Sequence, residues 1–227
     1  MTQDNGYITK TELARRYIQK TILSGQVRAG DRVTTREVSD ALGVSETPIR
    51  EAIRSLSSEG WLTVQNHVGA VVASIRPEQI HEISALRGAI CGLAIELSGD
   101  YYDAAILAQL DANLEAAHKA VANGEVHAFA ELNSKFHHML CDTPFAPWCL
   151  RIVENMLGLM SSQRHGFPPD LARLKQAVGE HQEIVEHIRR GNYAEAAAVA
   201  RTHELNAGIY LVGAMHDAGI FENQRAG

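Results

Sequence analysis

The sequence predicts a mainly α-helical protein with two domains. A helix-turn-helix with a small β-hairpin is expected over residues 1–76, and an antiparallel bundle of six helices over residues 77–227. The first prediction rests on three short amphipathic segments that precede two β-prone runs. The second rests on long helical patterns separated by brief Gly-, Asn- or Pro-containing breaks. With 227 residues, 45% of them apolar, the chain is long enough to bury both cores.

The first two helices are short and have clear end signals. Apolar residues recur at three- and four-residue steps over 11–24, which is typical of an amphipathic helix, and Gly25 ends it. Thr34 and Glu37 stand three residues apart, as in a capping box, and open a second helix through Leu42.

The third helix and the hairpin complete the first domain. Ser45 is a good N-cap, Pro48 falls in the first turn, and Gly60 ends the helix. The β-prone runs 61–64 and 71–74 flank a polar tip and predict a hairpin. Two short helices joined by a Gly-containing turn make a helix-turn-helix, so the whole domain is expected to be a winged helix-turn-helix.

The second domain is expected to be entirely helical. Gly, Asn, Asp and Pro residues interrupt an otherwise helical pattern at five places. The helices are expected at 78–99, 103–122, 125–141, 146–164, 170–190 and 193–217. Six helices of this length favour an antiparallel bundle.

The net charge of −6 is unevenly divided. Residues 1–75 hold nine Lys/Arg and eight Asp/Glu, whereas residues 76–227 hold twelve and nineteen. The N-terminal domain is therefore close to neutral and can bind nucleic acid even though the chain as a whole is acidic. Ten of the eleven histidines lie in the acidic part.

The composition also bears on the compartment. Charged residues interrupt the first thirty positions, and no window of about 18 apolar residues occurs, so we expect a cytoplasmic protein with no membrane span. Cys91, Cys141 and Cys149 are odd in number and lack CxxC spacing. We therefore expect buried, reduced thiols.

One face of the first domain carries the side chains expected at a DNA contact. On the third helix, Ser45, Thr47, Arg50 and Arg54 lie away from the apolar stripe and would face a major groove. Arg36, at the start of the second helix, is placed for a phosphate or groove contact. The planar arginine fork can reach guanine O6 and N7 together. The alternative is that these are solvated faces of short helices.

The same residues resemble a known family. The stretch 43–53, which reads GVSETPIREAI, together with EGWL at 59–62 and Gly69, resembles the DNA-binding domain of GntR-family transcription regulators. The resemblance implies that the wing tip near His67 and Gly69 enters a minor groove. It also implies contacts between double-stranded operator DNA and the side chains of Arg36, Ser45, Thr47 and Arg50.

Glu46 departs from the family pattern, because relatives usually have an arginine there that touches a base. An acidic residue beside phosphates is repelled, so Glu46 should weaken non-specific binding. It could instead accept a hydrogen bond from cytosine N4. A third interpretation is that Glu46, directly after the N-cap, only complements the helix dipole.

The second domain carries a candidate metal site. Asn133 and His137 are four residues apart and share one helix face, while His181 and His203 lie in the middle of two other expected helices. Three imidazoles and one amide oxygen could converge on a divalent cation, and zinc, nickel and manganese all suit this set. The alternative is that each histidine is a satisfied core residue.

These residues also resemble the metal-binding pattern of the FCD ligand domain in the FadR subfamily. The number of helices, six, resembles the shorter, VanR-like branch of that subfamily. Family members commonly have Asp where this chain has Asn133. The resemblance implies a small organic-acid effector, with Arg87 as the matching carboxylate-binding arginine and Arg164 as a further candidate. Arg87 could instead form a surface salt bridge with Glu82 or Glu96.

Together these features predict a cytoplasmic, homodimeric, metabolite-responsive repressor. Isologous dimers and palindromic operators share two-fold symmetry. A competing hypothesis is a metal-dependent enzyme that uses the three-histidine site, with the winged helix as an interaction module. It is disfavoured because Glu180 and Glu204, the local acid or base candidates, directly adjoin histidines and are expected on other helix faces. A third reading makes the metal purely structural.

Overall fold

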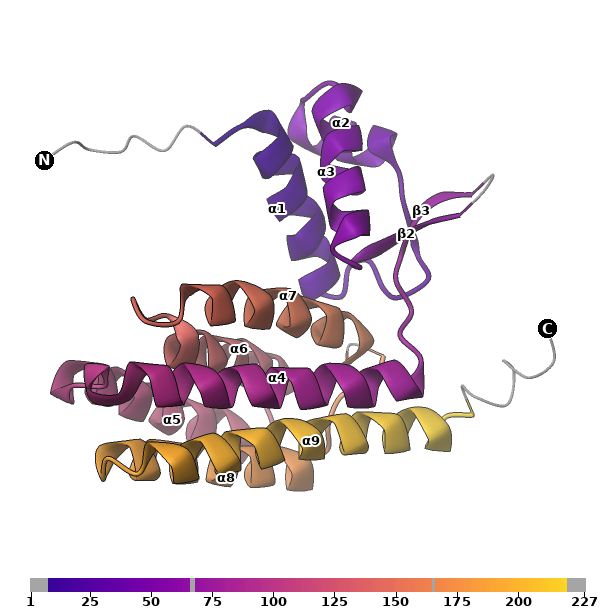
Figure 1. Cartoon of the computed structure of the whole chain (residues 1–227). Helices are drawn as coiled ribbons and strands as arrows, with labels where there is room; N and C mark the ends of the chain where they lie inside the picture. Colours follow the sequence, from indigo (N-terminus) through magenta and orange to yellow (C-terminus); the bar gives the residue numbers. More distant parts are fainter. Residues whose placement is uncertain (1–7, 66–67, 165, 220–227) are drawn as a thin grey trace, which may run out of the picture. The chain divides into compact units, whose positions relative to one another are not determined.

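The computed structural model describes residues 8–65, 68–164 and 166–219, without the side chains of residues 161, 162 and 164. Within these residues the chain forms nine α-helices, one short 3-10 helix and three strands, so the prediction of a mainly helical fold is confirmed (Figure 1). It divides into two compact units, residues 1–75 with 158–166, and residues 76–157 with 167–227. None of the described helices is long and apolar enough to cross a membrane.

The first unit contains the expected helix-turn-helix and hairpin. The capping box of Thr34 and Glu37 is confirmed, and Gly43 adopts a left-handed conformation with φ of 65° at the end of the second helix. Ser45 occupies the N-cap position of the third helix, but its hydroxyl makes no capping hydrogen bond. The elements are α1 Lys10–Leu23, β1 Arg32–Val33, α2 Thr35–Leu42, α3 Glu46–Ser58, β2 Leu62–Gln65 and β3 Gly69–Val72.

The small sheet has one strand more than the sequence predicts. β3 pairs antiparallel with β2, as a hairpin must, and also with β1, where Arg32 lies opposite Val71. The second hairpin strand begins at Gly69, two residues earlier than expected. Since β1 has only two residues, it has no alternation from which sequence reasoning could detect a strand.

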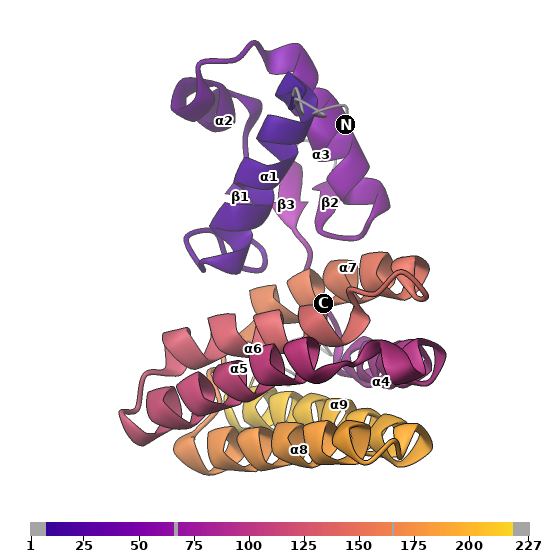
Figure 2. The ribbon, with the colours of Figure 1, turned by 90° about the vertical axis from the view of Figure 1, so that its left-hand side faces the viewer.

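Six helices follow the hairpin, with boundaries within two residues of those expected; they form most of the second unit, but residues 158–164 at the end of α7 belong to the first unit. α8 and α9 lie side by side, and α4 packs against α9 (Figures 1 and 2). Asp103 and Asp170 cap α5 and α8 through their carboxylates. The helices are α4 Pro77–Ser98, α5 Ala104–Ala122, α6 Val126–Cys141, α7 Pro147–Arg164, α8 Leu171–Arg189 and α9 Tyr193–Asp217.

Glycines allow α4 and α9 to approach closely. A Cβ added at Gly88 of α4 would lie 3.0 Å from Cα of Arg201 on α9, and one added at Gly208 of α9 would overlap the Ser84 hydroxyl. Contacts this short are rare for real side chains, so larger residues at either position would push the helices apart. Gly88 and Gly208 therefore leave room for the two backbones to approach each other beside Ser84, Arg201 and Glu204.

Candidate functional site

The exposed face of α3 presents the residues expected to contact DNA. The side chains of Ser45, Glu46, Thr47, Arg50 and Arg54 are all exposed, whereas the opposite face is buried in the core of the first unit through Ile49, Ala52 and Leu56. The helix therefore presents one apolar and one polar face, as the sequence predicts for a recognition helix.

The wing is bordered by a basic residue that sequence reasoning missed. His67 lies outside the described residues, but Gly69 begins β3 with φ of +98°. The guanidinium of Arg32 lies 3.7 Å from the position that a Cβ of Gly69 would take. The sequence does not predict that Arg32 lies close to Gly69, because the two residues are 37 positions apart and strand β1 cannot be predicted.

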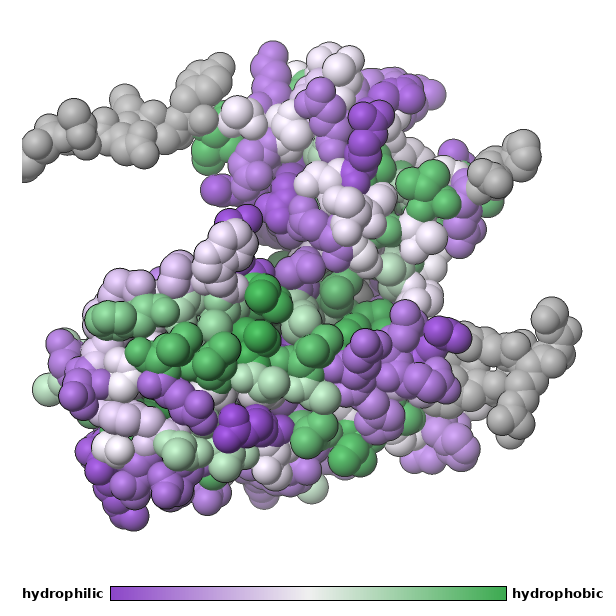
Figure 3. Space-filling view, viewed as in Figure 1, coloured by the Kyte–Doolittle hydropathy of each residue, from purple (hydrophilic) through white to green (hydrophobic). Residues whose placement is uncertain are grey.

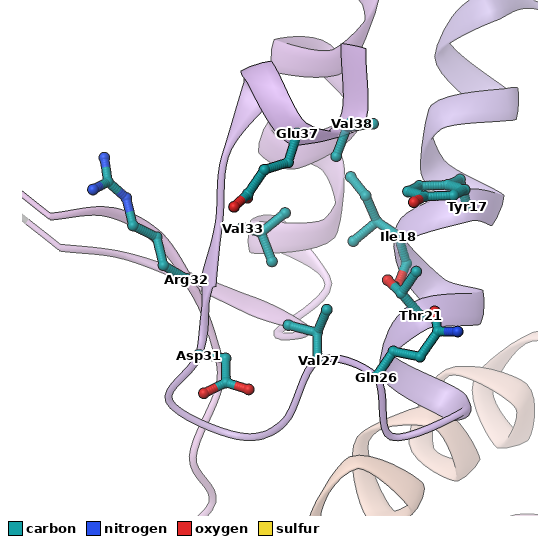
Figure 4. Close-up of a pocket in the computed structure, with 10 residues that line it drawn as sticks. All are labelled: Tyr17, Ile18, Thr21, Gln26, Val27, Asp31, Arg32, Val33, Glu37 and Val38. Atoms are coloured by element: carbon teal, nitrogen blue, oxygen red, sulfur yellow. The ribbon is translucent and has the colours of Figure 1, made fainter. Parts of the chain in front are cut away.

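The first unit also has a pocket of about 380 Å³ between α1, β1 and α2 (Figure 4). Its two carboxylates are already engaged, since Asp31 accepts a hydrogen bond from the Arg28 backbone N–H and Glu37 belongs to the capping box. The Arg32 side chain points away from the pocket (Figure 4). The pocket therefore has a mixed apolar and polar lining in which neither carboxylate is free for a ligand.

Three buried histidines meet in the centre of the second unit. His137 of α6, His181 of α8 and His203 of α9 are each at most 3% exposed. Nε2 of His203 lies 3.2 Å from Nε2 of His181 and 3.3 Å from Nε2 of His137. Two nitrogens that each lie about 2.1 Å from one ion, at an angle of about 100°, are about 3.2 Å apart. The two distances from His203 thus fit pairs of ligands on one divalent cation, and ligand nitrogens of all three histidines lie within 4.8 Å of one another.

Glu180 orients one of these rings. Its Oε2 lies 2.7 Å from Nδ1 of His203, so the ring carries its proton at Nδ1 and directs the Nε2 lone pair towards the other histidines. Arg173 and Asn206 donate hydrogen bonds to the same carboxylate. Burial raises the pKa of Glu180, but the hydrogen bonds from His203 and Asn206 and the charge of Arg173 outweigh it and bring the pKa to about 2.

Glu204 approaches a second ring. Its Oε1 lies 3.3 Å from Nδ1 of His137 and accepts a hydrogen bond of 2.7 Å from Nη2 of Arg87. The expectation that Glu180 and Glu204 point away from the histidines is therefore wrong. α9 is covered on two sides, by α4 and by α8, so neighbouring positions on one helix can both face the interior.

Arg87 is fully buried, with an exposed fraction of 0%. The alternative of a surface salt bridge with Glu82 or Glu96 is wrong, because its partner is the buried Glu204. Among the residues that the structure describes, its Nε and Nη1 atoms and Oε2 of Glu204 have no hydrogen-bond partner. Buried donors and acceptors without partners are rare and call for a bound group that satisfies them. The side chain of Arg164, the other effector candidate, lies outside the described residues.

Asn133 and the cysteines complete the surroundings. Asn133 is 6% exposed and lies one turn before His137 on α6. Ligand atoms of Cys91, His137 and Glu204 also lie within 4.8 Å of one another. The hydrogen bond with Cys141 and burial raise the pKa of the Cys91 thiol well above its usual value, and the Arg87 charge adjoins Glu204. Since a cysteine ligand must be deprotonated, this second group is poorly suited to a cation.

The comparisons with known proteins agree with both halves of the chain. Residues 10–72 match the model of bacterial regulatory proteins of the gntR family, and residues 82–206 match the FCD domain. An uncharacterised HTH-type regulator of Bacillus subtilis strain 168, YdhC, is 29% identical over 82% of this chain and 84% of its own. A probable repressor of a D-xylose utilisation operon from Paenarthrobacter nicotinovorans is 28% identical over 93% of both chains.

The solved structures show the same fold. Escherichia coli McbR/YncC superposes with a TM-score of 0.80 at 19% identity, over 92% of this chain and 99% of its own. A transcriptional regulator from Rhodococcus sp. RHA1 gives 0.75 at 18% identity, over 90% and 98%. The curated sequence relatives and the matching family model are described as transcription regulators, so the hypothesis of a metal-dependent enzyme is wrong. The chain belongs to the GntR family of bacterial transcription regulators and combines its DNA-binding domain with an FCD domain.

Proposed function

We propose that the chain is a cytoplasmic, metal-dependent repressor whose affinity for operator DNA changes when a small carboxylate binds to its FCD domain. The observation that carries the proposal is the convergence of the three imidazole Nε2 atoms beside a buried arginine with two unpartnered nitrogens. Where two of these Nε2 atoms are both deprotonated their lone pairs repel each other, so each close pair needs a shared proton or a cation between its nitrogens.

The residues present fit a divalent metal. His137, His181 and His203 would hold it through Nε2, with Asn133 on the same face of α6 as a fourth ligand. Zinc, nickel or manganese suits this donor set. The metal supplies positive charge for an anionic effector when bound. The chain itself fixes the ligands in place, because Glu180 holds His203 and Glu204 lies beside His137.

Arg87 would bind the effector carboxylate. Its Nη2 is held by Glu204, which leaves the donors of Nε and Nη1, on two different sides of the guanidinium, to bind an effector carboxylate. Arg164 remains a second candidate for this role. The effector alters operator affinity only by the difference in its affinity for the two states of the regulator.

In the DNA-binding domain we assign operator contacts to both faces described above. Arg36, Arg54 and α3 would approach the major groove, and Arg32, His67 and Gly69 the region of the wing. The side chains assigned to the α3 surface are Ser45, Glu46, Thr47, Arg50 and Arg54.

The test of the effector role uses full-length protein loaded in turn with zinc, nickel and manganese. Its affinity for a duplex selected from a random library is measured by fluorescence anisotropy with a panel of small carboxylates. We expect one class of acid to bind saturably and to change operator affinity by about 5- to 150-fold. Arg87→Lys keeps a charge for Glu204 but loses two donors, so it should retain metal and DNA binding and lose the response. A metal-loaded protein that responds to no acid would make the metal structural and contradict the proposal.

We also propose that the regulator is a homodimer formed through an apolar face of the second unit. Large apolar side chains are exposed along one side of α4 and on the neighbouring part of α7, and Figure 3 shows the apolar surface over both helices. A patch of this kind on a soluble domain marks an interface. Two copies on a two-fold axis would present two winged helices to a pseudo-palindrome. The exposed residues are Leu86, Leu93, Leu97, Trp148 and Ile152.

Leu97→Glu tests this interface. Leu97 is 50% exposed, and a carboxylate there would have to be buried against the second copy. We expect sedimentation velocity to show a monomer for Leu97→Glu and a dimer for the unaltered chain, with operator affinity lower by about 10²- to 10⁴-fold, because the two half-sites are no longer bound together. Leu171→Glu on α8 is the control, since Leu171 is 49% exposed but lies off this face. If Leu171→Glu dissociates the dimer as much as Leu97→Glu does, the dimer interface is not the apolar face of α4 and α7.

A further inference from the structure

Glu46, the acidic residue among the side chains assigned to the DNA-contacting surface of α3, pairs with one particular arginine. Oε2 of Glu46 lies 2.7 Å from Nη2 of Arg50, one turn further along α3. Thr35 of α2 donates a hydrogen bond of 3.4 Å to the same oxygen. Glu46 thus joins the start of the second helix of the motif to the arginine of the third.

This contact changes what Arg50 can do. An arginine side chain has many rotamers, and ordering it on DNA costs conformational entropy. The two side chains are 67% and 50% exposed, so the carboxylate that holds one Nη favours one orientation of the guanidinium before DNA arrives without fixing it, and four of the five N–H donors remain for a ligand. The carboxylate also repels phosphates, so it weakens every complex in which Arg50 does not gain a base contact.

We propose that Glu46 is a specificity-determining residue that positions Arg50 to read a guanine and disfavours DNA that lacks it. The inference rests on the proposed function, in which α3 enters the major groove. It goes beyond compensation of the helix dipole, which any acid in the first turn would provide without touching Arg50. It also differs from direct reading of cytosine, since Oε2 of Glu46 is engaged by Arg50 and Thr35.

The experiment compares full-length Glu46→Gln with the unaltered chain. Each is used to select binding sites from a random duplex library, and each is then titrated with its selected duplex and with a mixed-sequence duplex at several KCl concentrations. Glu51→Gln is the matched control. It removes the same charge from the same helix, but Glu51 contacts Thr11 rather than an arginine.

We expect the unaltered chain to select a guanine at one position of each half-site by about 5- to 150-fold, as one good bidentate contact provides. Glu46→Gln should lose most of that preference and bind the mixed-sequence duplex more tightly, by about tenfold at low salt. Glu51→Gln should keep the preference. Arg50→Lys should lose it as well, and the double variant Glu46→Gln/Arg50→Lys should lose no more than Arg50→Lys alone, since the two side chains act as a unit.

Other outcomes overturn the inference. If Glu46→Gln keeps the guanine preference and gains the same affinity for every duplex, Glu46 is only a charge that masks the DNA-contacting surface of α3. If it selects a new base in place of a cytosine, Glu46 reads that base directly. If the unaltered chain selects no sequence at all, the proposed reading of DNA by α3 fails, and the role of Glu46 with it. Circular dichroism of each variant separates these results from unfolding.

Discussion

Glu204→Leu is expected to destabilise the second unit by about 3–5 kcal/mol, which is the usual cost of leaving a buried charge without its partner. Arg87 is 0% exposed and Glu204 is 1% exposed, so the guanidinium has no access to water when the carboxylate is removed. Thermal and urea unfolding of the full chain, followed by circular dichroism, measure the loss. The double variant Arg87→Met/Glu204→Leu should recover most of the stability, because it removes both charges and keeps similar volumes.

The chain contains a matched control for this pair. Arg201 of α9 and Glu96 of α4 connect the same two helices at 3.6 Å, but both are more than 40% exposed. Glu96→Leu should change the unfolding free energy by less than about 0.5–1 kcal/mol, because water screens the exposed pair. A cost of under about 1 kcal/mol for Glu204→Leu would show that the Arg87 charge has another compensating partner.

The second large effect is expected from His137→Ala/His181→Ala. The unaltered protein should bind about one divalent ion per chain, and an excess of metal near 1,000 times Kd would stabilise it by about 4 kcal/mol. In a domain of this size that raises Tm by about 8–16 °C. The double variant should bind no metal and show no rise in Tm. Elemental analysis and thermal unfolding with added zinc, nickel or manganese measure both effects.

Two further variants make this test specific. His81→Ala/His118→Ala removes two exposed histidines of the same unit and should leave metal binding unchanged. Asn133→Asp adds a negative ligand to the proposed site and should tighten metal binding. Retention of a full equivalent of metal by the His137/His181 variant would show that the ion binds elsewhere.

Sequence reasoning could predict most of the architecture because its signals are local. The Thr34 and Glu37 capping box and Gly43 each fix a helix end through atoms within a few residues of one another. The histidines could be predicted in the same way, since each lies on an apolar face of a long helix. In both cases the signal lies among neighbouring residues of a single helix. A period of 3.6 residues then shows which side chains of that helix face inward.

The failures are contacts between segments far apart in the chain. Adjacent positions on a helix point in directions about 100° apart. The sequence therefore predicts that only one of His203 and Glu204 faces the interior. Gly88 and Gly208 let α4 approach α9 so closely that Glu204 is buried as well. The partnership of Arg87 with Glu204 spans 117 residues and has no local signal. The sequence does not predict strand β1 for a related reason. The strand is defined by its pairing with β3, which lies far away in the chain.

The three histidines project from the interiors of helices, so the proposed metal site is already ordered when the domain folds. Zinc modules built on loops gain their structure from the ion, since the ligands are disordered without it. Here the ligand-bearing backbones are ordered by the packing of α6, α8 and α9, so their conformational entropy is lost during folding and not during coordination. If the proposed site binds a metal, the ion can therefore exchange while the protein stays folded, and its occupancy would follow the available ion concentration.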